Sequence, residues 1–271
     1  MRDEFSAFLH SVAIKFHSQQ PLEFLPQVNG MDRTSVRGVC FYDGYQRGAF
    51  LKYGHLIDQV KRDPDYLEAI RASRLEAVCS IVDEARCINL FLLIRFFLGS
   101  LASRHIIEFG AYKGGNAIFM AMLLRKFHPD ARVIALDTFQ GAPSSDPAID
   151  KLPQNFRSAN LERTRDTARS LNLENLEFVP GLVEDTALDA CRSLGAIGLA
   201  HVDLVAHEPT RFAQQTVWDF LTPGGYLVQD DALEPTCPGA MLAVEELIHA
   251  HGPCIEQVWP HLVLRSAAAR P

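Results

Sequence analysis

Short apolar runs alternate with amphipathic segments along the chain from residue 105 onward. The apolar runs have the length of buried strands, and the segments between them carry apolar residues at helical spacing. The apolar runs predict strands at 105–109, 132–136, 176–179, 197–204 and 225–228. The intervening segments predict helices at 116–127, 161–171, 184–194, 209–221 and 238–250. The last two runs predict an antiparallel pair at 254–258 and 262–265.

Strands that alternate with helices in this way form a parallel sheet with right-handed crossovers, which makes the fold class α/β. The chain before this region has a different pattern. Residues 51–102 predict helices, and the apolar stretch 88–98 suits a buried helix. That stretch suits an interface between two copies of the chain equally well, so a homo-oligomer remains open. We divide the chain into a helical or lid region at 1–102 and a ligand-binding domain at 103–271.

Residues 1–50 are the least informative part of the sequence. A short amphipathic segment is predicted near the N-terminus, where Phe5, Phe8, Leu9 and Val12 recur at helical spacing. The aromatic, glycine-rich stretch 41–48 suits a packed loop, with a substrate lid as the alternative.

A glycine-rich turn joins the first strand of the predicted sheet to its helix. The strand carries Glu108, and the turn contains Gly110, Gly114 and Gly115. Glycine tolerates positive φ and lets a ligand approach the backbone closely. The following helix offers free N–H groups at the same point. Because open α/β sheets bind ligands at the carboxyl ends of their strands, we predict the binding site at this turn.

Acidic residues stand at the ends of four predicted strands: Glu108, Asp137, Asp203 and the pair Asp230-Asp231. One such acid is often a helix cap. Four in one sheet are harder to explain as caps. Since the carboxyl ends of parallel strands share one edge, we expect these side chains to converge on one crevice.

The first half of this crevice suits a nucleoside. Asp137 ends the second strand, where a carboxylate can accept both hydrogen bonds from a ribose diol. The glycine spacing does not match the G-x-G-x-x-G turn that cradles a pyrophosphate, which disfavours an NAD-dependent oxidoreductase. Glu108 would oppose an anion and attract a cation. A ligand with adenine, ribose and a positively charged end is S-adenosylmethionine.

The second half of the crevice suits a divalent metal. Asp203, Asp230 and Asp231 supply hard oxygen ligands, and Mg²⁺ binds through a few carboxylates while keeping positions for water or substrate oxygens. The alternative is that Asp230 and Asp231 cap the following turn or helix.

The composition of the chain limits the binding partners and the cellular compartment that we expect for the protein. The formal charge of −7 argues against nucleic acid or an anionic membrane as the main partner. Six scattered cysteines without a CxxC pair suit reduced thiols. The N-terminus lacks the basic and apolar segments of a signal peptide, and the stretch 88–98 is too short to span a bilayer. We expect a cytoplasmic protein that acts on a small molecule.

Three segments resemble the macrocin O-methyltransferase (TylF-like) family, whose magnesium-dependent enzymes methylate sugar hydroxyls of antibiotics. They are 107–115, the Asp-Thr-Phe-x-Gly-x-Pro segment at 136–143, and the region from 201 through 223–225 to Asp230-Asp231. The resemblance implies a Rossmann-like class I methyltransferase fold with a seven-stranded, mainly parallel sheet. It also implies S-adenosylmethionine and Mg²⁺ as cofactors, with the metal held by Asp203, Asp230 and Asp231. Cofactor contacts are expected from Glu108, Gly110, Tyr112, Gly114, Asp137, Thr138, Phe139, Gly181 and Asp203.

The chain departs from the family pattern at the fourth strand. Members usually read His-x-Asp-x-Asp-x-Tyr-Glu-Ser-Thr there, and this chain has Val205 and His207 at the second Asp and the Tyr. That Asp is a proposed general base in some members, and valine cannot accept a proton. His207 is the nearest replacement, since an unperturbed histidine has a pKa near about 6.5. It suits a packing residue equally well. We therefore assign catalytic roles to Asp203 and His207.

Two functions remain open. The first is a metal-dependent O-methyltransferase that acts on a natural-product sugar or polyketide-like hydroxyl. The second is a methyltransferase fold that binds S-adenosylmethionine with another role or without methylating, which the valine at position 205 keeps open.

Overall fold

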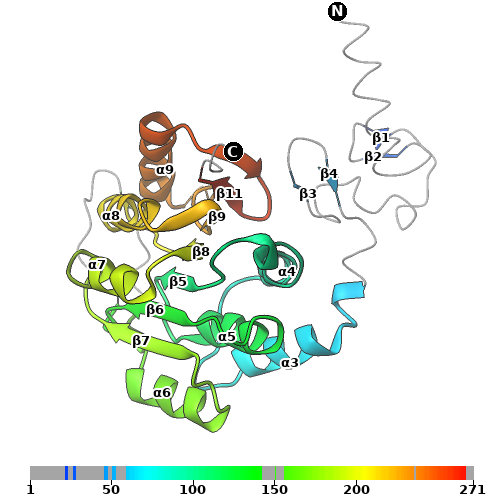
Figure 1. Cartoon of the computed structure of the whole chain (residues 1–271), viewed down its shortest axis with the longest axis vertical. Helices are drawn as coiled ribbons and strands as arrows, with labels where there is room; N and C mark the ends of the chain where they lie inside the picture. Colours follow the sequence, from blue (N-terminus) through cyan, green and yellow to red (C-terminus); the bar gives the residue numbers. More distant parts are fainter. Residues whose placement is uncertain are drawn as a thin grey trace, which may run out of the picture.

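One seven-stranded sheet organises the described part of the chain, in the order β10-β11-β9-β8-β5-β6-β7 (Figure 1). The strands are β5 (Ile106–Phe109), β6 (Val133–Asp137), β7 (Leu176–Pro180), β8 (Ile197–Val202), β9 (Leu221–Gln229), β10 (Cys254–Gln257) and β11 (Leu262–Arg265). Strands β5 to β9 are parallel, and β11 and β10 add an antiparallel edge. The predicted α/β fold with a mainly parallel, seven-stranded sheet is confirmed.

The computed structural model describes residues 59–141, 150, 156–234 and 236–266. It also describes four two-residue strands: β1 (Leu22–Glu23), β2 (Gln27–Val28), β3 (Gln46–Arg47) and β4 (Leu51–Lys52). The amphipathic segment predicted at 5–12 lies outside the described residues, and so does most of the aromatic stretch at 41–48.

Helices cover both faces of the sheet (Figure 1). They are α3 (Pro64–Ser73), α4 (Glu84–Leu92), α5 (Gly115–Phe127), α6 (Leu161–Ser170), α7 (Val183–Leu194), α8 (His207–Trp218) and α9 (Pro238–His251). Helices α3, α4 and α5 bury one hydrophobic cluster, and α7, α8 and α9 bury a second one on the opposite face. Side chains of neighbouring positions in β5 divide between the clusters, with Ile106 in the first and Ile107 in the second. This alternation is the period of a strand that is buried on both faces.

The described part of the predicted N-terminal region shares its core with α5. Tyr66 of α3 packs edge-to-face against Phe91 of α4 and Phe119 of α5, with ring centroids 5.5 and 6.0 Å apart. Asp63 caps α3 by accepting the N–H groups of Asp65 and Tyr66. Helices α3 and α4 therefore share one hydrophobic cluster with α5, and the division of the chain at residue 102 stays a prediction.

Two predicted boundaries at the site are wrong by a few residues. Strand β8 ends at Val202, so Asp203 and Leu204 follow the strand instead of belonging to it. Strand β9 begins at Leu221, before the predicted start at residue 225, and contains Pro223 and Gly224. The β8–β9 register is irregular between Ile197 and Leu199, and proline and glycine are tolerated in strands at such irregularities.

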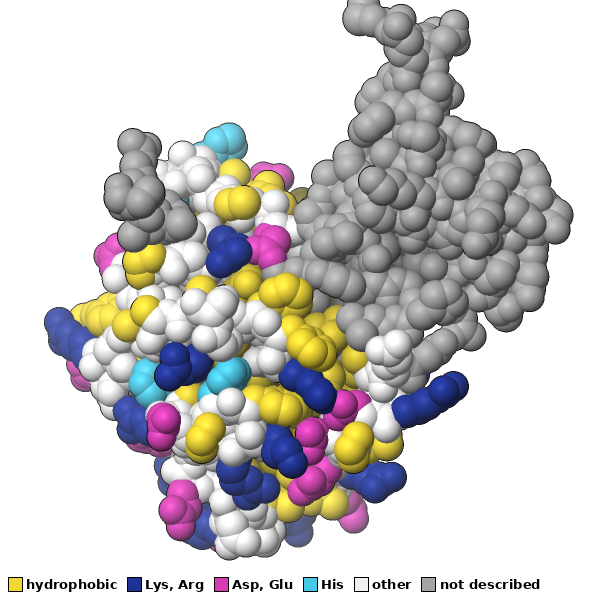
Figure 2. Space-filling view, turned by 45° about the vertical axis from the view of Figure 1, so that its right-hand side comes forward, with side chains coloured by type: hydrophobic (Ala, Val, Ile, Leu, Met, Phe, Trp, Pro, Cys, Tyr) yellow, Lys and Arg dark blue, Asp and Glu magenta, His cyan; other side chains and the backbone are white. Residues whose placement is uncertain are grey.

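Charges of both signs are intermixed on the face in Figure 2, where the described Lys and Arg side chains stand beside Asp and Glu. Within the described residues, no helix combines the length and the apolar composition that crossing a membrane requires.

Candidate functional site

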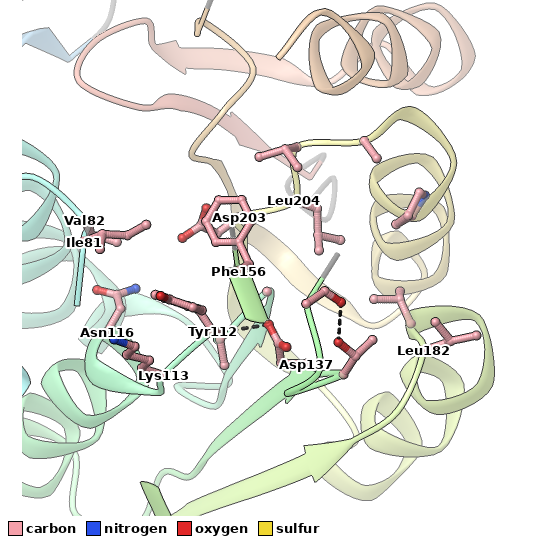
Figure 3. Close-up of a pocket in the computed structure, with 18 of the residues that line it drawn as sticks. Ile81, Val82, Tyr112, Lys113, Asn116, Asp137, Phe156, Leu182, Asp203 and Leu204 are labelled. Carbon is pink, nitrogen blue, oxygen red and sulfur yellow. Dashed lines mark hydrogen bonds between the residues drawn. The ribbon is translucent and has the colours of Figure 1, made fainter. Parts of the chain in front are cut away.

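A cavity of about 930 Å³, open solvent at its mouth included, lies at the carboxyl ends of the parallel strands (Figure 3). Asn116 and Ile81 lie on its α4 and α5 side, Leu182 lies on its α7 side, and Asp137 and Asp203 lie between them. Six residues predicted to bind the cofactor line it: Gly110, Tyr112, Asp137, Thr138, Gly181 and Asp203.

The glycine turn after β5 forms one wall of the cavity. The carbonyl oxygen of Leu136 accepts the N–H groups of Gly110 and Ala111 at 2.9 and 3.1 Å, which ties the turn to β6. Gly110 has φ +95° and Tyr112 has φ +50°. Positive φ is uncommon outside glycine and is often found where a loop is held for function.

Asp137 is held at the end of β6 by two backbone groups. Its Oδ2 accepts the N–H of Tyr112 at 2.8 Å, and its Oδ1 accepts the N–H of Phe139 at 2.7 Å. Burial raises the pKa of this carboxyl, and the two N–H groups act in the opposite direction. Each oxygen keeps a second lone pair, so the fixed carboxylate can still accept hydrogen bonds from two neighbouring hydroxyls.

Apolar and aromatic side chains line the cavity on both sides of Asp137. Leu182 and Val183 lie at the start of α7. Tyr112 packs edge-to-face on Phe156 with centroids 5.5 Å apart, and its hydroxyl lies 2.6 Å from Ser158 Oγ. This combination suits a flat, partly polar ring.

Three predicted cofactor residues do not line the cavity. Glu108 is fully buried, where its Oε1 accepts from Asn116 Nδ2 at 2.6 Å and lies 3.1 Å from His201 Nδ1. A Cβ on Gly114 would lie 2.4 Å from Thr164 Cγ2. Phe139 packs its ring against that of Phe178. Glu108 is connected to the cavity wall through its hydrogen bond with Asn116, which lines the cavity.

The acids after β8 and β9 converge as predicted. Ligand oxygens of Asp203, Asp230 and Asp231 all lie within 4.8 Å of one another. Burial and the negative charge of Asp230 raise the pKa of Asp231 to about 6. Burial, together with the charges of Asp230 and Asp231, also raises the pKa of Asp203. Asp231 Oδ2 is buried and has no hydrogen-bond partner among the described residues.

Asp230 differs from the other two acids because cationic and polar donors surround it. Its Oδ2 accepts from Arg86 Nη1 at 2.8 Å, and its Oδ1 accepts from His261 Nε2 at 2.9 Å. Arg86 also binds Glu234 at 2.6 Å. Although burial acts to raise it, the neighbouring imidazoles of His201 and His261 hold the pKa of Asp230 well below its usual range. Arg86 and His261 were not predicted from the sequence, because they lie far from the acids along the chain.

His207 does not point into the cavity with Asp203. It is the first residue of α8, and its ring nitrogens lie 3.1 Å from Glu246 and 3.3 Å from Glu208. Its backbone N–H donates to Asp150 Oδ1. Val205, in contrast, lines the cavity. In this arrangement the His207 ring faces two carboxylates instead of the cavity. Its role as a general base stays a prediction.

The fold and the site together define a Rossmann-like O-methyltransferase fold, with the fixed Asp137 carboxylate and a three-carboxylate cluster at one sheet edge. Residues 76–256 match the family model of the macrocin-O-methyltransferases (TylF). The chain belongs to this family of O-methyltransferases, as its sequence resemblance predicted.

Similar proteins include a curated relative and several solved structures. The chain is 26% identical over 173 residues to an 8-demethyl-8-(2,3-dimethoxy-alpha-L-rhamnosyl)-tetracenomycin-C 4'-O-methyltransferase from Streptomyces olivaceus, over 60% of this chain and 66% of that protein. It is similar to the O-methyltransferase NovP, with a TM-score of 0.61 and 20% identity over 78% of this chain and 95% of that one. It is also similar to the calicheamicin methyltransferase CalS11, with a TM-score of 0.59 and 19% identity over 75% and 93% of the two chains.

Proposed function

We propose that this protein transfers a methyl group from S-adenosylmethionine to a hydroxyl of a small natural-product acceptor, with a divalent metal. Two features at the same edge of the sheet support this proposal: the fixed Asp137 carboxylate and the cluster of Asp203, Asp230 and Asp231. The first suits a nucleoside diol, and the second suits a cation near the acceptor oxygen.

The residues around the cavity suit S-adenosylmethionine. Asp137 would bind the ribose hydroxyls, and the turn at Gly110 would lie along the amino-acid part. Leu182 and Val183 would flank the adenine. When bound, this cofactor supplies an electrophilic methyl group. The protein's own task is to hold both reactants in place, which can contribute several kcal/mol to catalysis, up to about 7–11.

The acid cluster suits Mg²⁺ because the negative charges of two of its carboxylates are not balanced by neighbouring cations in the described part of the chain. Asp231 Oδ2 has no partner among the described residues. Burial and, after it, the negative charges of the neighbouring carboxylates raise the pKa values of Asp203 and Asp231. Bound Mg²⁺ would supply Lewis acidity that makes an acceptor hydroxyl easier to deprotonate. Asp203, Asp230 and Asp231 would hold it.

A sugar hydroxyl is the acceptor that the relatives favour. The Streptomyces relative is named for methylation of a rhamnosyl group, and CalS11 is also described as a TDP-rhamnose 3'-O-methyltransferase. The wall beside Asp203 contains Leu204, Val205 and Ala206, which would exclude water from the reacting groups. The cytoplasmic location and a homo-oligomeric state stay predictions.

The second function, binding of S-adenosylmethionine without methylation, is favoured by one observation. Val205 lines the cavity beside Asp203 and cannot accept a proton, while His207 is turned toward Glu208 and Glu246. Product formation separates the two functions.

The test combines calorimetric titration with S-adenosylmethionine, with and without Mg²⁺, and a methylation assay on rhamnosylated polyketide acceptors. We expect saturable binding, and a product heavier than the acceptor by one methylene unit. Asp231→Asn should abolish the Mg²⁺ effect, whereas the exposed control Asp189→Asn should not. Binding without product from any acceptor would favour the second function, and no binding would contradict both.

A further inference from the structure

A buried chain of hydrogen bonds connects α4 and the C-terminal strands to Asp230. It runs from Gln257 of β10 through Asn89 of α4 to His261, which precedes β11. His261 Nε2 then lies 2.9 Å from Asp230 Oδ1. All four side chains are at most 4% exposed, so solvent does not supply alternative partners.

A backbone carbonyl determines which groups donate and which accept along this series of hydrogen bonds. The carbonyl oxygen of Trp259 only accepts hydrogen bonds, and the Gln257 side-chain nitrogen donates to it at 2.9 Å. The same nitrogen lies 2.8 Å from Asn89, whose atom at that contact must therefore be its oxygen. The other end of the Asn89 amide is then its nitrogen, which faces His261 Nδ1 at 3.0 Å.

The tautomer of His261 follows from this order. Asn89 donates to Nδ1, so Nδ1 carries a lone pair and the ring proton of a neutral imidazole sits on Nε2. Nε2 can then donate to Asp230 Oδ1. Reversing the two amides would bring the Gln257 oxygen against the Trp259 carbonyl oxygen, which leaves two acceptors facing each other.

The tautomer decides which of two groups of potential metal ligands can bind a cation. Both groups include Asp230. His201, Asp230 and His261 have ligand atoms within 4.8 Å of one another, and a transition metal such as Zn²⁺ favours such imidazole ligands. His261 Nε2 carries a proton in the observed arrangement, so it has no lone pair for a metal. The three-carboxylate set remains, and its oxygen ligands suit Mg²⁺.

We propose that His261 is a positioning residue whose proton, placed on Nε2 by Asn89 and Gln257, orients Asp230 toward the acid cluster and keeps the site selective for oxygen-preferring cations. The proposal rests on the metal role of Asp230 that is proposed above. Arg86 binds the other oxygen of Asp230 at 2.8 Å, so one donor on each oxygen holds the carboxylate. Partners that orient metal ligands typically contribute about 10–100-fold to metal affinity.

Two measurements on the full-length protein test this proposal without activity. Long-range ¹H–¹⁵N NMR of the histidine rings reports which nitrogen carries the proton, with His261 assigned from its absence in His261→Gln. We expect an unprotonated Nδ1 in the wild type and a protonated Nδ1 in Asn89→Asp, because the introduced carboxylate can only accept. A protonated wild-type Nδ1 would overturn the inference.

Titration with Mn²⁺, followed by electron paramagnetic resonance, measures the affinity of the acid cluster. We expect His261→Leu to bind Mn²⁺ about 10–100-fold more weakly. His261→Gln, which keeps a donor, should recover part of this loss, and the exposed control His249→Gln should match the wild type. Equal affinities of wild type and His261→Leu would overturn the positioning role. If the wild type binds no Mn²⁺, the metal role itself fails, while the NMR result still decides the hydrogen-bond chain.

Discussion

A Cβ atom on Gly110 would lie 1.9 Å from the carbonyl oxygen of Asp203. The two residues directly follow the neighbouring parallel strands β5 and β8, and the Asp203 N–H donates to the Phe109 carbonyl at 2.9 Å. The glycine turn after β5 and the first acid of the three-carboxylate cluster are thus in direct backbone contact. A change in one must move the other.

We expect Gly110→Ala to damage both halves of the site. The backbone at φ +95° disfavours an L side chain by about 1–3 kcal/mol, and the contact with Asp203 adds to this cost. The variant should unfold at a lower denaturant concentration and should lose both S-adenosylmethionine and Mn²⁺ binding in calorimetric titrations.

Gly252→Ala is the matched control. Gly252 also has positive φ, +54°, but nothing lies within 4 Å of the added Cβ. It should lose about 1–2 kcal/mol of stability from the backbone conformation alone and should bind both ligands normally. Full ligand binding by Gly110→Ala would show that the contact with Asp203 does not couple the two halves.

We expect Asp137→Asn to weaken cofactor binding. The carboxylate accepts the N–H groups of Tyr112 and Phe139, and an amide would turn its NH₂ group toward one of these donors. A carboxylate held less firmly binds the ligand hydroxyls less well, and losing a hydrogen bond to a charged group costs about 1.5–3 kcal/mol, which corresponds to about 10–150-fold in affinity. Calorimetry with S-adenosylmethionine measures the loss, and Asp189→Asn is the exposed control. Unchanged affinity would remove Asp137 from the binding site.

Much of the fold was predictable because its signals are local. Apolar runs such as 132–136 carry the length and spacing of buried strands, and glycine and acidic residues mark their ends. Asp203, Asp230 and Asp231 could be grouped because parallel strands align their carboxyl ends. Asp137 could be placed in the cavity by the same rule.

The remaining parts of the site depend on long-range packing. Arg86 reaches Asp230 from a helix early in the chain, and His261 reaches it from the antiparallel edge. Local patterns carry no information about such partners. The orientation of Glu108 depends on which face of β5 meets α5, and that of His207 depends on Glu246 of α9. Both residues were assigned to the cavity from position alone.

Asp231→Asn should stabilise the metal-free protein at neutral pH. Its carboxyl has a pKa of about 6 in the folded protein and an ordinary value of 3.8, so the folded state holds the proton more tightly. Stability therefore falls as the pH rises from about 4 to about 6, and the lost free energy is on the order of 3 kcal/mol at pH 7. Asparagine removes this penalty because it carries no charge.

Urea unfolding of wild type and Asp231→Asn, each without metal at pH 4 and pH 7, measures the effect. The variant should be the more stable protein at pH 7, and its advantage should shrink toward pH 4. Added Mg²⁺ should stabilise only the wild type at pH 7. A variant less stable than the wild type at pH 7 would mean that the Asp231 carboxylate is already compensated without metal.

Arg86→Met should destabilise the protein, and a divalent metal should partly reverse the loss. Arg86 binds Asp230 and Glu234 at 2.8 and 2.6 Å, and the Asp230 side chain is only 4% exposed. Removing one partner of a buried ion pair costs about 3–5 kcal/mol because the other charge stays buried. Mg²⁺ on the acid cluster would supply positive charge to Asp230 in place of the guanidinium. Urea unfolding with and without Mg²⁺ should therefore show a larger metal-induced gain in the variant than in the wild type.

The control Arg192→Met removes an exposed pair with Asp189 and should change stability by no more than about 1 kcal/mol, with an unaltered Mg²⁺ response. An equal Mg²⁺ gain in Arg86→Met and wild type would show that the guanidinium and the metal do not share the charge of Asp230.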